Sequence, residues 1–100
     1  MLIAIVDFTV APENRPSALG ALLAAAPAIR DMTRNLAFQP YLDPVNAGAI
    51  RIFHEWQDAA SFDVYTASAV FKSLSQVLRP LMIAPPISRR MKADLLETVC

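Results

Sequence analysis

The N-terminal segment, residues 2–10, limits the possible folds more than any other part of the chain. It reads LIAIVDFTV and is dominated by branched and aromatic residues, which is typical of a β-strand. Apolar side chains occupy both alternating faces, with Leu2 and Phe8 on one face and Ile3 and Ile5 on the other. A strand that is apolar on both faces is covered on both sides. The helices of a short chain can cover one side, so we expect a partner subunit to cover the other.

The composition of the chain supports the same conclusion. Hydrophobic residues make up 55% and charged residues 18% of the sequence, against about 45–50% and about 25% in an average domain. A chain of 100 residues has room for one core, so we treat residues 1–100 as a single domain. One small core cannot hide this much apolar surface, and the excess is expected to line a ligand pocket or a subunit interface. We therefore predict a homodimer.

Charge and cysteine content limit the classes of partner. Nine basic and nine acidic residues give a net charge of zero without a basic stripe, which argues against nucleic-acid binding. The single Cys100 cannot form an intrachain disulfide, so we expect a cytoplasmic location. The first residues lack the features of a signal peptide. No apolar run approaches the roughly 20 residues that span a bilayer, so we expect no membrane partner.

The middle of the chain predicts a helix followed by a strand. Apolar residues recur at helical spacing between Pro16 and Thr33, and Pro16 suits a first helical turn. Pro27 removes an internal hydrogen bond and is expected to kink or split this helix. Residues 36–43 alternate as a strand, and Pro40 cannot donate to a hydrogen-bond ladder. We therefore place this strand at an edge of the sheet.

The second half predicts two strands around a broken helical unit. Residues 49–57 read as a strand, and Asp58 is a suitable N-cap for a short helix over residues 59–67. Ser68 is expected to cap a further helix. The last strand begins at Ile87 and is expected to continue through the C-terminal residues, with charges on one face. Charges discourage stray pairing, so this strand is expected to form the second edge.

The element order is therefore β-α-β-β-α-β, an α+β class with an antiparallel sheet. The ferredoxin-like arrangement of this order places the first and third strands in the centre. That arrangement puts the strand with Pro40 and the strand with Arg89 and Lys92 at the two edges. Local chemistry and topology agree on these positions, which favours the ferredoxin-like fold.

Residues 53–71 contain the candidate functional groups. They include the only histidine, His54, the only tryptophan, Trp56, and one of two tyrosines, Tyr65. Period two places His54 and Trp56 on one face of their strand, roughly 7 Å apart, and Tyr65 on the helix that closes over the sheet. An imidazole, an indole and a phenol around an apolar cavity are typical of an aromatic-binding site. Further pocket-lining residues are expected to be Phe62, Phe71 and Leu74.

Each of these residues also has a purely structural interpretation. A lone histidine at a strand end is often a hydrogen-bonded structural residue, and a lone tryptophan in a small domain is usually part of the core. Tyr65 can be ordinary packing of a helix face. One histidine and one cysteine without ligand spacing predict no metal site. The sequence contains no nucleophile elbow and no phosphate loop.

A resemblance to the antibiotic biosynthesis monooxygenase (ABM) family is carried by two runs, HEWQDAASF at residues 54–62 and SAVFK at residues 68–72. In that family the third strand ends in Glu-Trp, a short helix with an acidic cap follows, and Ser-x-x-Phe opens the next helix. The β-α-β-β-α-β order extends the resemblance over the whole chain. It implies a dimeric α/β barrel, in which two ferredoxin-like sheets face each other with the helices outside.

The same resemblance implies oxygenation of quinol-like or polycyclic phenolic compounds without a cofactor. The substrate supplies the electrons, and the protein needs a dry aromatic pocket, a proton acceptor and donors for a developing oxyanion. Trp56 matches the family's strand-end Trp, as a donor or ring platform, and His54 is the candidate acceptor.

The sequence also departs from the family pattern. Many members carry a His on the short helix, where this chain has Tyr65. Haem-degrading relatives use an Asn on the first strand and a His on the last long helix. This chain has Asp7 or Phe8 and Ser75 there, which disfavours haem degradation.

Three functions remain open at this point, because a fold does not determine a function. The first is a monooxygenase acting on a small aromatic or quinol, with His54, Trp56 and Tyr65 as catalytic residues. The second is a non-catalytic dimeric barrel that binds a hydrophobic metabolite. The third is an isomerase or lyase on the same scaffold. Oxygen consumption with a candidate substrate separates the first from the other two.

Overall fold

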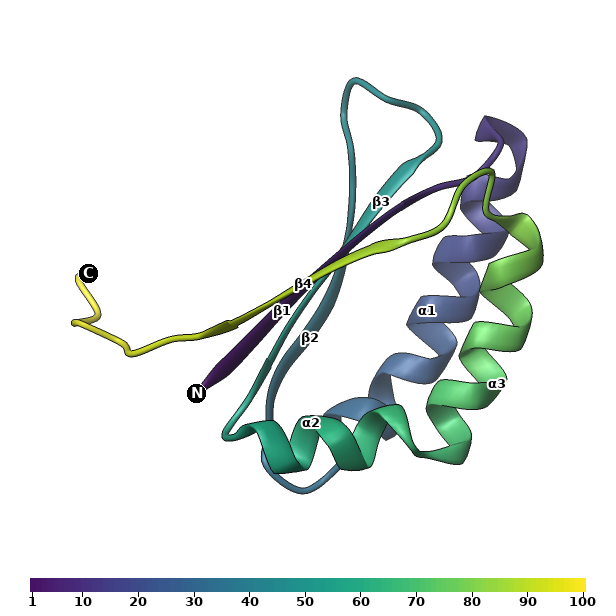
Figure 1. The fold of residues 1–100 in the computed structure, drawn as a ribbon. Coiled ribbons are helices and arrows are strands. Elements are labelled where there is room, and N and C mark those ends of the chain that lie inside the picture. The colour runs from purple at the N-terminus through teal and green to yellow at the C-terminus, as the bar shows by residue number, and fades with distance from the viewer.

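The computed structural model describes residues 1–100 and shows a four-stranded antiparallel sheet with three α-helices (Figure 1). The α+β class and the predicted order of elements are confirmed. In chain order the elements are β1 (Leu2–Thr9), η1 (Pro12–Asn14), α1 (Arg15–Arg30), β2 (Asn35–Leu42), β3 (Ala49–Trp56), α2 (Ala59–Thr66), α3 (Ala69–Leu78), η2 (Arg79–Leu81) and β4 (Ile87–Lys92).

The strands are arranged in the order β2-β3-β1-β4. β1 and β3 are central, as predicted, and pair in register from Leu2 opposite Trp56 to Thr9 opposite Ala49. Pro40 lies on the edge strand β2, where its missing N–H costs no ladder bond. β4 forms the other edge, and all of its residues are exposed. The ferredoxin-like topology is therefore confirmed.

The helices lie on one face of the sheet. α1 and α3 run side by side along this face, and α2 crosses its lower end (Figure 1). Ala4 and Phe8 of β1 point toward the helices and are 0% and 4% exposed. Ile3 and Ile5 point to the opposite face, where no element of the chain covers them, and they are half-buried. One apolar face of β1 therefore has no cover within the chain.

Pro27 was expected to kink or split this helix; α1 continues through Pro27 as one helix of 16 residues, so it is not split. Pro27 and Leu23 are both exposed, and the carbonyl of Leu23, which loses its partner to the proline, can bond to water instead. The buried face of α1 has helical spacing and consists of Ala18, Leu22, Ala26 and Ile29. None of the helices combines the length and the apolar composition that crossing a membrane requires.

Both predicted N-caps are confirmed. The carboxylate of Asp58 accepts a hydrogen bond from the backbone N–H of Ser61 at 2.8 Å, and α2 begins at the following residue. The hydroxyl of Ser68 accepts from the N–H of Phe71 at 3.2 Å and caps α3. β3 ends at Trp56, so the connection from strand to helix consists of Gln57 and Asp58 alone.

The last strand is shorter than predicted. β4 ends at Lys92, and residues 93–100 have no regular secondary structure and project from the body of the protein (Figure 1). Lys92 pairs with Leu2, the first residue of β1. Beyond this point only Met1 remains: its carbonyl accepts from the N–H of Ala93 at 2.8 Å, and its N-terminal amine donates to the carbonyl of Ala93 at 2.8 Å. The strand stops because its pairing partner has ended.

Candidate functional site

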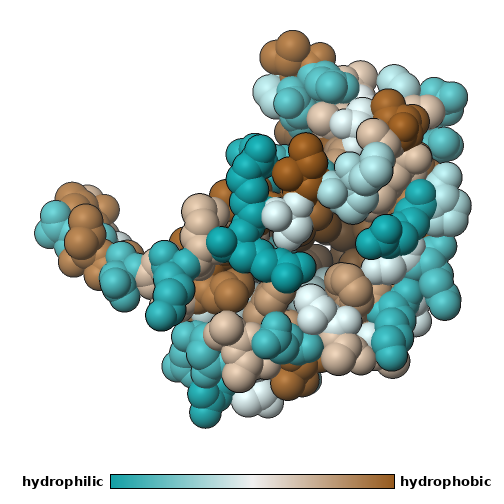
Figure 2. All heavy atoms as spheres, viewed as in Figure 1, coloured by the Kyte–Doolittle hydropathy of each residue, from teal (hydrophilic) through white to brown (hydrophobic).

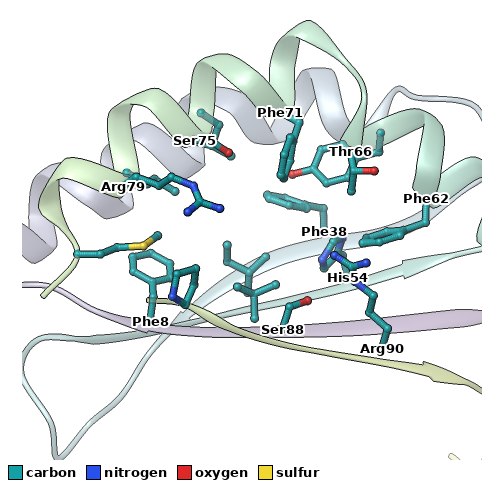
Figure 3. Close-up of a pocket in the computed structure, with 17 residues that line it drawn as sticks. Phe8, Phe38, His54, Phe62, Thr66, Phe71, Ser75, Arg79, Ser88 and Arg90 are labelled. Carbon is teal, nitrogen blue, oxygen red and sulfur yellow. The ribbon is translucent and has the colours of Figure 1, made fainter. Parts of the chain in front are cut away.

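A cavity of about 150 Å³ lies between the helix-facing side of the sheet and helices α2 and α3 (Figure 3). In the space-filling view it appears as a hollow beside α3, with hydrophobic side chains in its depth and hydrophilic side chains at its rim (Figure 2). A cavity of about this volume holds one benzene-sized ring. The aromatic residues that line it are Phe8, Phe38, Phe62, Tyr65 and Phe71.

His54 lies on β3 and lines the cavity. It faces the helices because period two puts it on the same side as Ile52, which packs in the core. Its ring is 3% exposed and lies 5.6 Å from Phe38 and 5.5 Å from Phe62, between ring centroids. Burial, with a further contribution from the positive charge of Arg90, lowers the pKa of His54 from 6.5 to about 4. His54 is therefore neutral at pH 7.

One hydrogen bond determines which nitrogen of His54 carries the proton. The indole Nε1–H of Trp56 donates to Nδ1 of His54 at 2.9 Å. Nδ1 must therefore be unprotonated, and in the neutral ring the proton is on Nε2. Nε2 is the one buried side-chain nitrogen or oxygen of the protein that has no hydrogen-bond partner. His54 thus offers an unused N–H donor beside the cavity, and the geometry does not support its expected role as a proton acceptor.

Trp56 does not line the cavity, which corrects the expectation that the indole enters it. The residue is 0% exposed, and its ring stacks on Tyr65 with 5.2 Å between centroids and 24° between planes. Its only donor is used by His54. Trp56 can influence a ligand only through the orientation and tautomer of His54.

Tyr65 lies on α2 and lines the cavity. Its hydroxyl makes no hydrogen bond within the chain, and the residue borders the cavity where a ligand would lie. Burial raises the pKa of Tyr65 from 10.0 to about 12, so the phenol keeps its proton at pH 7. Phe62, Phe71 and Leu74 also line the cavity, in the positions where the sequence predicts pocket residues.

The sequence interpretation missed two arginines that line the cavity. Arg79 extends from η2, which follows the C-terminal end of α3, and Arg90 extends from β4 at the end of the cavity where His54 lies (Figure 3). From the sequence, Arg90 is only one of the charged residues expected on the last, edge-forming strand. The missing information was the register, which pairs both Arg90 and His54 with Ala4 and so puts them on the same face.

The polar groups of the cavity are all capable of donating hydrogen bonds. They are the N–H of His54, two guanidinium groups and the hydroxyls of Thr66, Tyr65, Ser75 and Ser88. No Asp or Glu lines the cavity. No three His, Cys, Asp or Glu side chains cluster anywhere in the structure. This arrangement can exclude water from an aromatic ring and stabilise negative charge on its oxygen atoms.

The family comparison matches most of the chain. The model of the antibiotic biosynthesis monooxygenase family matches residues 1–76, which include β1 through α2, most of α3 and the whole segment with His54, Trp56 and Tyr65. No curated protein matches the chain.

Three solved structures share the fold over nearly the whole chain. A crystal structure of an antibiotic biosynthesis monooxygenase is 22% identical, has a TM-score of 0.87 and covers 95% of this chain and 100% of that one. A candidate antibiotic biosynthesis monooxygenase from Deinococcus radiodurans is 16% identical, with a TM-score of 0.90 and coverages of 100% and 99%. Rv0793 from Mycobacterium tuberculosis is 17% identical, with a TM-score of 0.85 and coverages of 98% and 98%. At these identities the likeness shows the fold alone.

Proposed function

The chain belongs to the antibiotic biosynthesis monooxygenase family, and we propose that it is a cofactor-independent monooxygenase acting on a small aromatic substrate of the quinol type. The observation that carries this proposal is that His54, which lines a cavity of aromatic rings, has a buried Nε2–H without a hydrogen-bond partner. A buried donor without a partner is costly unless a ligand accepts from it. The cavity volume favours a single ring over a polycyclic substrate.

The proposed reaction needs no electrons from the protein. Hydroquinone and dioxygen give hydroxybenzoquinone and water: one oxygen atom forms the new C–O bond, the other leaves as water, and the ring supplies all four electrons. The reactive form of the substrate is its anion, which is the stronger electron donor. Hydrogen-bond donors and cations stabilise such an anion and lower the substrate's own pKa. The substrate proton leaves to solvent, because no group with a free lone pair and a suitable pKa lines the cavity.

The proposed roles follow from the positions of the side chains. His54 and Tyr65 donate hydrogen bonds to oxygen atoms of the substrate and of the oxygenated intermediate. Trp56 is a positioning residue, since it keeps the proton of His54 on Nε2. Phe62 and Phe71 contact the ring of the substrate and exclude water. Leu74 contributes apolar surface from α3.

Oxygen uptake tests the proposal directly. The protein is mixed with a panel of hydroquinones, and we expect one dioxygen consumed per substrate, with one atom of isotope-labelled oxygen in the product. The variants His54→Phe and Tyr65→Phe keep an aromatic ring but lose a donor. Each is expected to lower turnover about tenfold or more. This loss is equal to or smaller than the loss that follows the removal of one donor from an oxyanion hole. Full turnover in both variants would refute the assigned roles.

A non-catalytic barrel that binds a hydrophobic metabolite is the second candidate. It is favoured by the lack of a proton acceptor: Nδ1 of His54 is occupied by Trp56, and Tyr65 remains protonated. This function predicts that a ligand changes the fluorescence of Trp56 while no oxygen is consumed and no product forms. The two candidates therefore differ in a single measurement.

We also propose that the active form is a homodimer in which two sheets face each other. The uncovered face of the sheet carries Ile5 and Phe53 in its centre and Ile87 and Met91 at its edge, the last two 55% and 42% exposed. Burying such a face against a second copy follows from the hydrophobic effect. The cavity lies on the other side of the sheet, so the two copies each keep their own site.

A cytoplasmic location, expected from the single Cys100, belongs to the same proposal and remains a prediction. Cys100 is an exposed free thiol at the end of the chain. Such a thiol is compatible with a reducing compartment. Fractionation of cells that express the protein would test the location.

A further inference from the structure

The charge around the cavity is one-sided. Arg79 and Arg90 line it, and no carboxylate does. Neither arginine takes part in an ion pair, since the three ion pairs of the protein use Arg34, Arg51 and Arg89. The two guanidinium groups also make no hydrogen bond to another residue of the chain. Both cations therefore remain available to a ligand.

Arg90 lies next to the unpartnered donor of His54. Both residues pair with Ala4, one from each neighbouring strand, so their side chains stand on the same face of the sheet. The guanidinium carbon of Arg90 lies 4.8 Å from the centroid of the Phe62 ring, and the His54 ring lies 5.5 Å from the same centroid. Figure 3 shows both side chains at the Phe62 end of the cavity. A cation and a histidine with a free donor thus both pack against Phe62 at one end of the cavity.

This pairing of groups selects for negative charge. The donor of His54 is buried and unsatisfied, so it favours a ligand atom that accepts a hydrogen bond. Arg90 lies on the exposed edge strand β4 and lines the cavity, so its charge attracts an anion at the rim and can pair with it through a charge-assisted hydrogen bond. A neutral apolar ligand would fill the cavity but leave both groups without a partner. An anionic oxygen satisfies both at once.

We propose that the cavity recognises a single-ring aromatic acid, whose carboxylate lies between Nε2 of His54 and the guanidinium of Arg90. The ring then extends toward Phe71, and a ring hydroxyl can reach the hydroxyl of Tyr65. This inference rests on the proposed function in taking the cavity as the substrate site, and it narrows the quinol substrate to one that carries an acidic group.

Arg79 is the alternative anchor and fits less well. Its side chain points into the cavity from η2, at the opposite end from His54 (Figure 3). No buried, unpartnered donor stands beside it, because Nε2 of His54 is the only such atom in the protein. We therefore assign the carboxylate of the ligand to Arg90. Arg79 then faces the end of the ligand that is opposite the carboxylate.

Calorimetric titration with two matched probes tests this assignment. The probes are gentisate, which is hydroquinone with one ring carboxylate, and its uncharged methyl ester. We expect the wild-type protein to bind gentisate about tenfold or more tightly than the ester, the gain of one charge-assisted contact. The variant Arg90→Gln is expected to lose this preference and to bind the ester unchanged. Arg90→Lys is expected to keep part of it.

Lys92→Gln is the matched control. Lys92 lies on the same strand and the same face as Arg90 and carries the same charge, but it does not line the cavity. We expect this variant to keep the full preference for gentisate. An effect as large as that of Arg90→Gln would mean that only the net charge of the protein matters, and would refute the site.

Three further results would overturn the inference. They are equal binding of gentisate and ester to the wild type, no binding of gentisate up to millimolar concentrations, and a loss of preference in Arg79→Gln but not in Arg90→Gln.

The proposed function can fail independently of this inference. Binding of gentisate without oxygen consumption refutes the monooxygenase and leaves the acid preference intact, whereas oxidation of plain hydroquinone without any preference for gentisate refutes the acid preference alone.

Discussion

The indole nitrogen of Trp56 donates a hydrogen bond of 2.9 Å to Nδ1 of His54, and both side chains are buried, at 0% and 3% exposure. The two residues are neighbours on one face of β3, and their rings meet edge to face, with 77° between planes. This bond removes the one lone pair of the neutral imidazole from the cavity and leaves a donor in its place. The chemistry of the site therefore depends on a residue that does not touch the cavity.

The first prediction concerns the pKa of His54. Trp56→Phe removes the donor to Nδ1, and with it an interaction that only the neutral imidazole can make. The pKa of His54 is expected to rise above about 4 but to stay below its ordinary 6.5, since burial, the main cause of the shift, remains. His54 is the only histidine, so one ring signal in an NMR titration reports the value.

Tyr65→Phe is the control for this titration. It removes a hydroxyl that makes no hydrogen bond within the chain and leaves the bond between Trp56 and His54 in place. The pKa of His54 is expected to stay near its wild-type value. A Trp56→Phe variant with the wild-type pKa would show that the indole does not hold the tautomer.

Trp56→Phe is also expected to lower the free energy of unfolding by about 1–3 kcal/mol, because Nδ1 of His54 becomes a buried acceptor without a partner.

The second prediction is a loss of stability below neutral pH. The pKa of His54 is about 4 in the folded protein and 6.5 in the unfolded chain. Between these values the unfolded state binds more protons, so the free energy of unfolding falls as the pH falls from 6.5 toward 4. Above 6.5 the contribution is fully present, and a shift of this size corresponds to roughly 3 kcal/mol. Urea denaturation at a series of pH values measures it.

His54→Phe serves as the reference for that series. It keeps an aromatic ring in the cluster with Phe38 and Phe62 but cannot titrate. The variant is expected to show a flatter dependence of stability between pH 6.5 and pH 5, where few carboxylates take up protons. Identical slopes in the variant and the wild type would contradict the lowered pKa.

The topology could be predicted because several local signals agree with it. Pro40 restricts β2 to an edge, the charges of β4 suit the other edge, and the apolar faces of β1 require a central position. The path of α1 through Pro27 could not be predicted, because the sequence does not show that the disturbed turn faces water. The end of β4 could not be predicted either, because it depends on which residue of β1 pairs with which residue of β4.

The site could be predicted in its location but not in its chemistry. Period two puts His54 and Trp56 on the helix-facing side of β3, and the capped helix brings Tyr65 over them. The bond between His54 and Trp56 depends on the orientation of both rings, which packing determines. Arg90 was missed because period two alone does not tell which face of an edge strand turns toward the helices.

The third prediction concerns the cap that joins α2 to α3. The hydroxyl of Ser68 accepts from the N–H of Phe71 and donates to the carbonyl of Tyr65 at 2.6 Å. Ser68→Ala is expected to lower the free energy of unfolding by about 1 kcal/mol, the usual cost of losing an N-cap. Ser73→Ala makes the same chemical change at an exposed position inside α3, where alanine is the better helix former. Denaturation curves in which both variants lose equal stability would contradict the capping role.

The fourth prediction compares the two glycines. A Cβ at Gly48 would overlap the carbonyl oxygen of Val10, and the N–H of Val10 donates to the carbonyl of Gly48 at 2.9 Å. Gly48→Ala must separate these two backbone segments and is expected to cost roughly 1–3 kcal/mol. A Cβ at Gly20, within α1, meets no atom within 4 Å, so Gly20→Ala is expected to stabilise the protein by up to about 1 kcal/mol. Thermal unfolding of both variants gives the comparison.

The fifth prediction tests the proposed dimer through the uncovered face of the sheet. Phe53 lies opposite Ile5 in the middle of this face, so Phe53→Glu would bury a charge between the two sheets without a partner. The wild type is expected to sediment as a dimer and Phe53→Glu as a monomer at micromolar concentration. Val64→Glu is the control, because Val64 is 64% exposed on α2, on the helix side of the sheet, and this variant should remain dimeric. A wild-type protein that sediments as a monomer would leave the apolar face of β1 in water and would refute the barrel, since nothing else in the chain covers Ile3 and Ile5.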